Sequence, residues 1–210
     1  MIARRGLLTG GAALSVMGMA TPSEIRFDVL RNGSKIGRHE VDFQQRDDTL
    51  VATTTVEIVY AFGPIVLFRY NHSVRETWSG GTFQTLESET NDNGKRFRVR
   101  AVRARAGIDV DSSALPRAVL PPETIPLTHW NILDMQRPLF DPQDGKAIEA
   151  RATPRGEEMV PLADGKLVRA THYSLAGTVS LDDWYDSARM WTALRSKGTD
   201  GSTIDYRRAV

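Results

Sequence analysis

The chain has 210 residues, of which 40% are hydrophobic and 25% are charged, a composition typical of a soluble globular protein. Its formal net charge is +1 and it contains no cysteine. The near-neutral charge gives no electrostatic reason to expect nucleic-acid binding. The lack of cysteine excludes disulfides, thiol catalysis, cysteine metal ligands and a lipid-modified cysteine anchor.

Residues 1–20 have the pattern of a signal peptide. A basic pair, Arg4 and Arg5, precedes a run of apolar and small residues that ends at Ala20, so the pattern predicts cleavage before Thr21. The arginine pair is followed by a glycine and two leucines. This order favours the twin-arginine export route over an ordinary secretory signal.

Residues 21–210 are expected to form one periplasmic domain. The apolar run of the signal is shorter than the roughly 20 residues that cross a bilayer, and no later segment supplies a stop-transfer helix. Once residues 1–20 are removed, the formal net charge becomes −1. The exported domain is therefore expected to have no transmembrane span and no affinity for nucleic acid.

An alternation of apolar and polar residues predicts a series of β-strands from Ile25 onwards. Glycine-containing turn signals separate the early strands. These signals are Asn32-Gly33, Gly80-Gly81 and Asp92-Asn93-Gly94. Because such turns are short, successive strands are expected to be antiparallel neighbours in a meander.

The middle of the chain interrupts this pattern. Residues 115–126 contain four prolines, which predict an extended loop, and Thr128 is a suitable cap for a short helix over 130–135. Strands resume at 147–152 and 157–160. About ten strands and one short helix predict an all-β, mainly antiparallel fold, either a strongly curved meander sheet or an incomplete β-barrel. A closed lipocalin-like barrel is the second choice, and a two-sheet sandwich is the third.

Common catalytic and cofactor motifs are absent from the sequence. There is no nucleophile elbow, P-loop, dinucleotide-binding glycine motif, HExxH zinc motif or EF-hand loop. The four histidines show no close metal-ligand spacing, so we expect neither a metal site nor a cofactor. They are His39, His72, His129 and His172.

The predicted strand over 68–78 is the most informative segment about a site. Side chains two residues apart share one face of a strand. One face is mostly apolar and consists of Phe68, Tyr70, His72, Val74, Glu76 and Trp78. His72 and Glu76 are about 13 Å apart along the strand, so they do not share a proton or a metal ion directly. Other strands must supply their partners.

His39 is a candidate partner, because it lies on the apolar face of its own strand beside Val41 and Phe43. A buried imidazole or carboxylate needs a hydrogen-bond partner. One interpretation is a polar spot inside a concave ligand pocket. The other is a hydrogen-bond network that is satisfied within the core, and this arrangement is the more common one in proteins.

Arg96, Arg98 and Arg100 share one face of another predicted strand. They predict either a basic surface for phosphate groups or acidic glycans, or the solvated outer face of a half-buried strand. The second interpretation is favoured because outward charge is normal in a sheet. Glu87 and Glu89 are then the expected cross-strand partners.

The segment 128–131 follows the proline-rich loop and contains Trp130. It is either a lid over a cavity or a plug that fills one open end of the sheet. Large aromatic side chains mostly serve burial, which favours the plug. Asp182, Asp183 and Asp186 lie close to a predicted turn, and we do not assign them as a catalytic carboxylate pair.

Six short motifs occur in order along nearly the whole exported chain. They are Gly33-x-x-Ile36-Gly37-x-His39, Tyr70-x-His72-x-x-x-Glu76-x-Trp78, Asn91-Asp92-Asn93-Gly94, His129-Trp130-Asn131, Trp184-Tyr185-Asp186 and Asp200-Gly201-Ser202-x-Ile204-x-Tyr206. In this order they resemble an uncharacterised family of exported proteobacterial proteins, described as a domain of unknown function. That family is similar in strand layout to the LolA/LolB-type lipoprotein carriers, although this chain lacks the anchoring cysteine of LolB.

The resemblance implies a periplasmic half-barrel with an apolar cavity, and it implies no catalytic residues. Our first hypothesis is a binding protein for a lipid or another amphipathic small molecule. Its expected ligand-binding residues are Phe68, Tyr70, His72, Val74, Glu76, Trp78, His39 and Trp130. The alternatives are a non-catalytic interaction module of the cell envelope, and an enzyme acting on envelope lipid or glycan through His72, Glu76 and His39.

Overall fold

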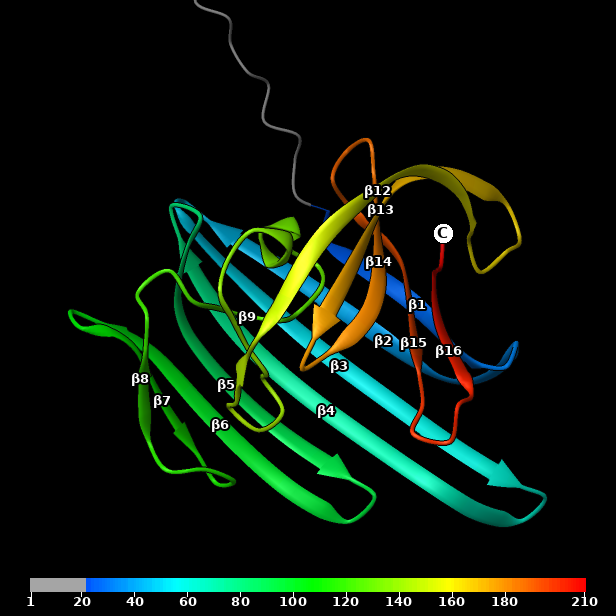
Figure 1. Cartoon of the computed structure of the whole chain (residues 1–210), viewed down its shortest axis with the longest axis horizontal. Coiled ribbons are helices and arrows are strands. Elements are labelled where there is room, and N and C mark those ends of the chain that lie inside the picture. Colours follow the sequence, from blue (N-terminus) through cyan, green and yellow to red (C-terminus); the bar gives the residue numbers. More distant parts are fainter. Residues whose placement is uncertain (1–21) are drawn as a thin grey trace, which may run out of the picture.

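The computed structural model describes residues 22–210 (Figure 1). The predicted twin-arginine signal, residues 1–20, lies outside the described residues and stays a prediction. Within residues 22–210, no helix has the length and apolar character needed to span a bilayer.

Most of the described chain belongs to one antiparallel sheet of 13 strands, in the order β12-β13-β14-β15-β16-β1-β2-β3-β4-β5-β6-β7-β8. Its strands are β1 (Glu24–Arg31), β2 (Ser34–Arg46), β3 (Thr49–Phe62), β4 (Ile65–Ser79), β5 (Thr82–Asp92), β6 (Lys95–Ala104), β7 (Gly107–Ser112), β8 (Ala118–Leu120), β12 (Ala150–Pro161), β13 (Leu167–Gly177), β14 (Ser180–Asp186), β15 (Trp191–Lys197) and β16 (Thr203–Arg208). The first and last strands pair in the middle of this sheet.

The predicted meander is confirmed, and the sheet is open. In Figure 1 the long strands β1–β6 run side by side, while β12 and β13 arch away from them. The edge strands β8 and β12 are at opposite ends of the strand order, so the second-choice closed barrel does not form. Local alternation fixes strands and their faces, whereas closure depends on the curvature of the whole sheet.

A crossing segment between β8 and β12 packs against the concave face of the sheet. It contains β9 (Ile125–Pro126), β10 (Leu139–Phe140) and β11 (Ala147–Ile148), which form a second, three-stranded sheet. The short predicted helix is a single 3₁₀ turn, η1 (Ile132–Met135). Phe140 of this segment is fully buried and belongs to the same core cluster as Val74 and Leu86 of the large sheet. The segment therefore closes the core that the open sheet leaves uncovered.

The edge strand β12 corrects one predicted boundary. The sequence pattern predicts two strands, at 147–152 and 157–160. In the structure 147–148 belong to β11, and 150–161 form one long strand with a register shift between Pro154 and Gly156. Proline lacks a backbone N–H and is tolerated on an edge strand or at a bulge. Pro154 is in both situations, so it bends β12 without ending it.

The inner face of the sheet is organised in rows across neighbouring strands. One row runs from His39 of β2 through Val56 of β3 and His72 of β4 to Thr90 of β5. These residues belong to four successive strands and are far apart in the sequence. The register of the strands places them side by side.

Candidate functional site

A cavity of about 320 Å³ lies between the inner face of β2–β4 and the crossing segment. Its inner end is at Thr54 and Val74, both buried. Towards the β3–β4 turn its walls become more exposed, since Tyr70 and Phe68 are only half-buried. The cavity therefore opens at the end of the sheet that carries the β3–β4 turn.

Five of the predicted site residues line this cavity: His39, Phe68, Tyr70, His72 and Val74. Four of them come from β4 and share a face, as the alternation of that strand predicts. His39 reaches the same cavity because β2 and β4 are the two neighbours of β3. His72 also contacts Thr90, with 2.8 Å between His72 Nδ1 and the threonine Oγ1.

The other three predicted residues form a separate cluster further along the strands. The Trp130 indole N–H donates to Glu76 Oε1 over 3.1 Å, and the Trp78 indole N–H donates to Oε2 of the same carboxyl over 2.9 Å. The two indole rings also meet edge to face. Glu76 is fully buried, and burial raises its pKa to about 7 despite these hydrogen bonds. None of the three lines the cavity.

Sequence reasoning missed a second buried polar pair beside the cavity. His129 of the crossing segment lines the cavity, and its Nδ1 lies 2.8 Å from Oδ2 of Asp183 on β14. The other Asp183 oxygen accepts the Trp191 indole N–H over 2.9 Å. Burial opposes the charging of His129, but the adjacent Asp183 carboxylate, together with Asp134 and Asp141, outweighs burial and raises the His129 pKa. The two residues are 54 positions apart, so no local spacing in the sequence predicts that they pair.

The backbone holds His129 in an uncommon conformation. Its φ is 65°, in the left-handed region that few residues other than glycine adopt. Oδ2 of Asp134 accepts its backbone N–H over 2.6 Å, and the Tyr185 hydroxyl donates to its carbonyl oxygen over 2.8 Å. These contacts fix the imidazole at the cavity wall.

Charge is suppressed on several other groups that line the cavity. Burial lowers the pKa of His72 to about 4 and lowers that of His39 well below its ordinary value. Burial also raises the pKa values of Tyr70 and Asp141. The two imidazoles are therefore neutral at pH 7, and each ring offers one N–H donor and one acceptor nitrogen.

Three residues that line the cavity carry a polar atom with unmet hydrogen-bonding capacity. His39 Nε2, Thr54 Oγ1 and Thr128 Oγ1 are buried and have no hydrogen-bond partner among residues 22–210. Buried polar groups are nearly always paired, because leaving one unpaired costs about 1–3 kcal/mol. The side chains that carry these three atoms are our candidates for binding a polar group inside the cavity.

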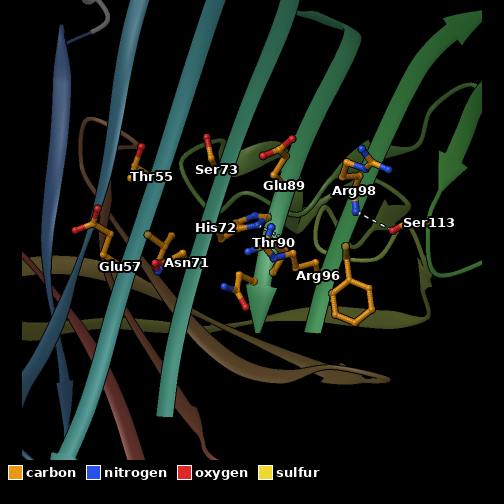
Figure 2. A pocket seen from close by; sticks show the side chains of 13 residues that line it. Thr55, Glu57, Asn71, His72, Ser73, Glu89, Thr90, Arg96, Arg98 and Ser113 are labelled. Carbon is orange, nitrogen blue, oxygen red and sulfur yellow. Dashed lines mark hydrogen bonds between the residues drawn. The ribbon is translucent and has the colours of Figure 1, made fainter. Parts of the chain in front are cut away.

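A second hollow, of about 510 Å³, lies on the outer face of the sheet (Figure 2). One of its rows runs from Thr55 through Ser73 and Glu89 to Arg98. Two of the three arginines predicted to share one face, Arg96 and Arg98, line this hollow, and Glu89 lies opposite Arg98 in the register, as the sequence predicts. Its charged lining residues are two glutamates and two arginines, a balance typical of the solvated side of a sheet.

The structure also bears on metal binding. Among the residues it describes, no three His, Cys, Asp or Glu side chains come together as a metal site would require. His39, His72 and His129 line one cavity without forming such a group.

Fold and site together define an open antiparallel β-protein with a small, partly polar cavity on its concave side. The chain belongs to the family described as Domain of unknown function (DUF6134), whose match spans residues 27–209. No curated protein is significantly similar to it.

Proposed function

We propose that this protein is a periplasmic binding protein for a small amphipathic molecule. The observation that carries the proposal is a set of unpartnered buried atoms, His39 Nε2, Thr54 Oγ1 and Thr128 Oγ1, on residues that line an otherwise largely apolar cavity. A ligand with a polar head at these atoms and an apolar tail towards Phe68 satisfies both surfaces. The predicted signal peptide supports the periplasmic setting, and the resemblance of the sequence motifs to a family likened to carrier half-barrels supports the ligand class.

The head group is expected to be uncharged. The imidazoles of His39 and His72 are neutral, and His129 is already balanced by Asp183. An anionic head would lose its hydration without gaining a counter-ion, which is costly in a buried site. A cationic head would find the carboxyl of Asp141 in the cavity wall, but one oxygen of that carboxyl already accepts the backbone N–H of Gln143. A hydroxyl or carbonyl group gains hydrogen bonds from the neutral imidazoles at a smaller loss of hydration.

The cavity volume limits the size of the ligand. A volume of about 320 Å³ is at the small end of ligand pockets. At roughly 30 Å³ per water-sized group, it holds about ten non-hydrogen atoms. A single short chain fits inside, whereas a lipid with several acyl chains does not.

An acid–base enzyme has less support. Both carboxyl oxygens of Glu76 accept indole N–H groups, and Glu76 does not line the cavity that His39 and His72 share. The three groups of that hypothesis therefore do not converge on one reacting atom.

Native mass spectrometry of the protein purified from the periplasm, together with solvent extraction, tests the proposal. We expect a bound molecule of about ten non-hydrogen atoms. Protein stripped of ligand is then titrated calorimetrically with 1-decanol, decanoate and decyltrimethylammonium. Decanol is expected to bind most tightly.

The matched variants are Val56→Phe and Thr55→Phe. Val56 lies between His39 and His72 in one inner row, so the phenyl ring occupies the cavity and abolishes binding. Thr55 is the next residue and faces outwards, so its variant keeps wild-type affinity. A clean apo mass with no response to any of the three probes, or equal binding by both variants, contradicts the proposal.

A further inference from the structure

The β3–β4 hairpin extends beyond both neighbouring strands. The last paired residues are Gly37 and Ile58 between β2 and β3, and Tyr70 and Asp92 between β4 and β5. Residues 59–62 and 65–69 therefore have strand partners only in each other, and Arg69 alone of them also accepts a backbone hydrogen bond from the β5–β6 turn. We call this two-stranded extension the β3–β4 ribbon; it projects at the lower right of Figure 1.

The ribbon concentrates exposed apolar side chains. Five of the nine large apolar side chains that are exposed in residues 22–210 lie on it. They are Val59 (43% exposed), Phe62 (76%), Ile65 (60%), Val66 (48%) and Leu67 (51%). A cluster of this kind marks a surface that another phase or molecule covers.

Both faces of the ribbon are apolar, and this favours one kind of partner. Ile65, which pairs with Phe62, and Val66 point to opposite sides of β4, because neighbouring paired residues of a strand alternate. A protein surface covers one face of such a ribbon and leaves the other in water. The acyl and headgroup boundary of a bilayer surrounds an inserted ribbon on all sides.

Positive charge lies beside the apolar tip. Arg69 is opposite Val59 in the ribbon, and its carbonyl accepts the backbone N–H of Asn93 from the β5–β6 turn over 2.8 Å. That turn leads into Lys95 and Arg96. All three cations are exposed, and within residues 22–210 none forms an ion pair of the kind that joins Arg38 to Glu57.

We propose that the β3–β4 ribbon docks the protein on an anionic lipid bilayer, with its apolar tip in the interfacial layer and the three cations at the headgroups. Apolar burial and attraction to anionic headgroups together give such interfacial binding. Docking would bring the open end of the cavity to the membrane, since Phe68 belongs to both the ribbon and the cavity wall, and the cavity residue Tyr70 follows directly after the ribbon. Docking itself does not depend on the proposed ligand, so either proposal can fail without the other.

Vesicle flotation tests this inference. The protein is produced without residues 1–20, because the predicted signal peptide would itself bind lipid, and no described element begins before Glu24. Vesicles of phosphatidylethanolamine with phosphatidylglycerol are compared with vesicles of phosphatidylcholine. We expect binding to the anionic vesicles that weakens as salt is raised.

The tip variant Phe62→Ser with Ile65→Ser is expected to reduce partitioning to the anionic vesicles about tenfold or more. The matched control is Val119→Ser with Leu167→Ser, which changes two apolar residues of similar exposure (60% and 61%) away from the ribbon. It is expected to stay within about twofold of wild type, since it leaves the inserted tip unchanged.

A second variant, Arg69→Gln with Arg96→Gln, keeps the tip and removes two cations. It is expected to lose the preference for anionic over neutral vesicles, and it decides the matter if the tip variant fails to fold. The proposal is overturned if the wild type does not float, or if the tip and control variants float equally. It is also overturned if lipid-free sedimentation shows a dimer that only the tip variant dissociates, because the partner is then a second copy.

Discussion

Buried polar side chains in and near the cavity differ in whether their hydrogen-bonding atoms have partners. His39 and Thr54 leave buried polar atoms unpartnered among the described residues, whereas Glu76 uses both oxygens to accept indole N–H groups. The first arrangement lowers stability and suits binding, and the second joins the crossing segment to the sheet. Residues with the same polar character therefore have opposite effects on the free energy of unfolding.

Thr54→Val is expected to raise the free energy of unfolding of the ligand-free protein by about 1 kcal/mol, because it removes a buried hydroxyl without a partner. The same variant is expected to bind 1-decanol more weakly, since the ligand loses a hydrogen bond. Urea unfolding and calorimetric titration measure the two effects. Thr55→Val, on the outer face, is expected to change neither by much. Lower stability of Thr54→Val would show that its hydroxyl is already paired.

The raised pKa of Glu76 predicts that the free energy of unfolding falls as pH rises. Burial raises its pKa from 4.5 to about 7, so the folded state holds this proton more tightly than the unfolded state does. The contribution to stability is therefore lost as pH rises from about 4.5 to about 7, and it then stays constant. Glu76→Gln removes this slope, and relative to wild type it gains about 3 kcal/mol over that interval. Urea unfolding at pH 4.5 and pH 8 checks the difference, and parallel curves would contradict it.

At the level of elements, β2 depends on one glycine. A Cβ atom at Gly37 would lie 2.1 Å from the carbonyl oxygen of Glu57 on β3, which is backbone and cannot rotate away. Gly37 also precedes the irregular step between β1 and β2, where the register shifts after Val29. The close approach of the strands at this point therefore requires a residue without a side chain.

Gly37→Ala is expected to lower the free energy of unfolding by about 2 kcal/mol or more, because the strands must separate. Gly198→Ala is the control, since the nearest atom to its Cβ is the side-chain oxygen of Ser202, which can rotate. Thermal unfolding of both variants gives the comparison. Equal losses would show that the contact at Gly37 is relieved without moving β3.

At the level of the whole molecule, the crossing segment links the two halves of the open sheet. It fastens to β14 through His129 and Asp183, and to β4 through Trp130 and Glu76. The cavity lies between these two hydrogen-bonded contacts and the β3–β4 ribbon. The same segment that completes the core thus also forms one wall of the site.

Asp183→Ala is expected to lower the free energy of unfolding by about 3–5 kcal/mol, because it leaves His129 buried without its counter-charge. Asp182→Ala is the neighbouring control. Its carboxylate pairs with His172 at a partly exposed position, so its loss is expected to cost less than about 1 kcal/mol. Urea unfolding distinguishes the two, and similar losses would mean that the buried pair does not fasten the segment.

The sequence by itself determined the local features. Alternation along 68–78 placed Phe68, Tyr70, His72 and Val74 on one face, because the side-chain period of a strand is two wherever the strand lies. The glycine turns likewise determined the antiparallel order of the early strands, since a short turn leaves only the adjacent position free.

Tertiary structure alone decided which of these faces enclose space. His129 and Asp183, 54 residues apart, meet only when the crossing segment folds onto the sheet, and no periodicity encodes such a contact. The same fold separated Glu76, Trp78 and Trp130 from the cavity, because the crossing segment fills the sheet at that end. The sequence pattern does not predict the projection of the β3–β4 ribbon either, since this projection depends on where the neighbouring strands β2 and β5 end.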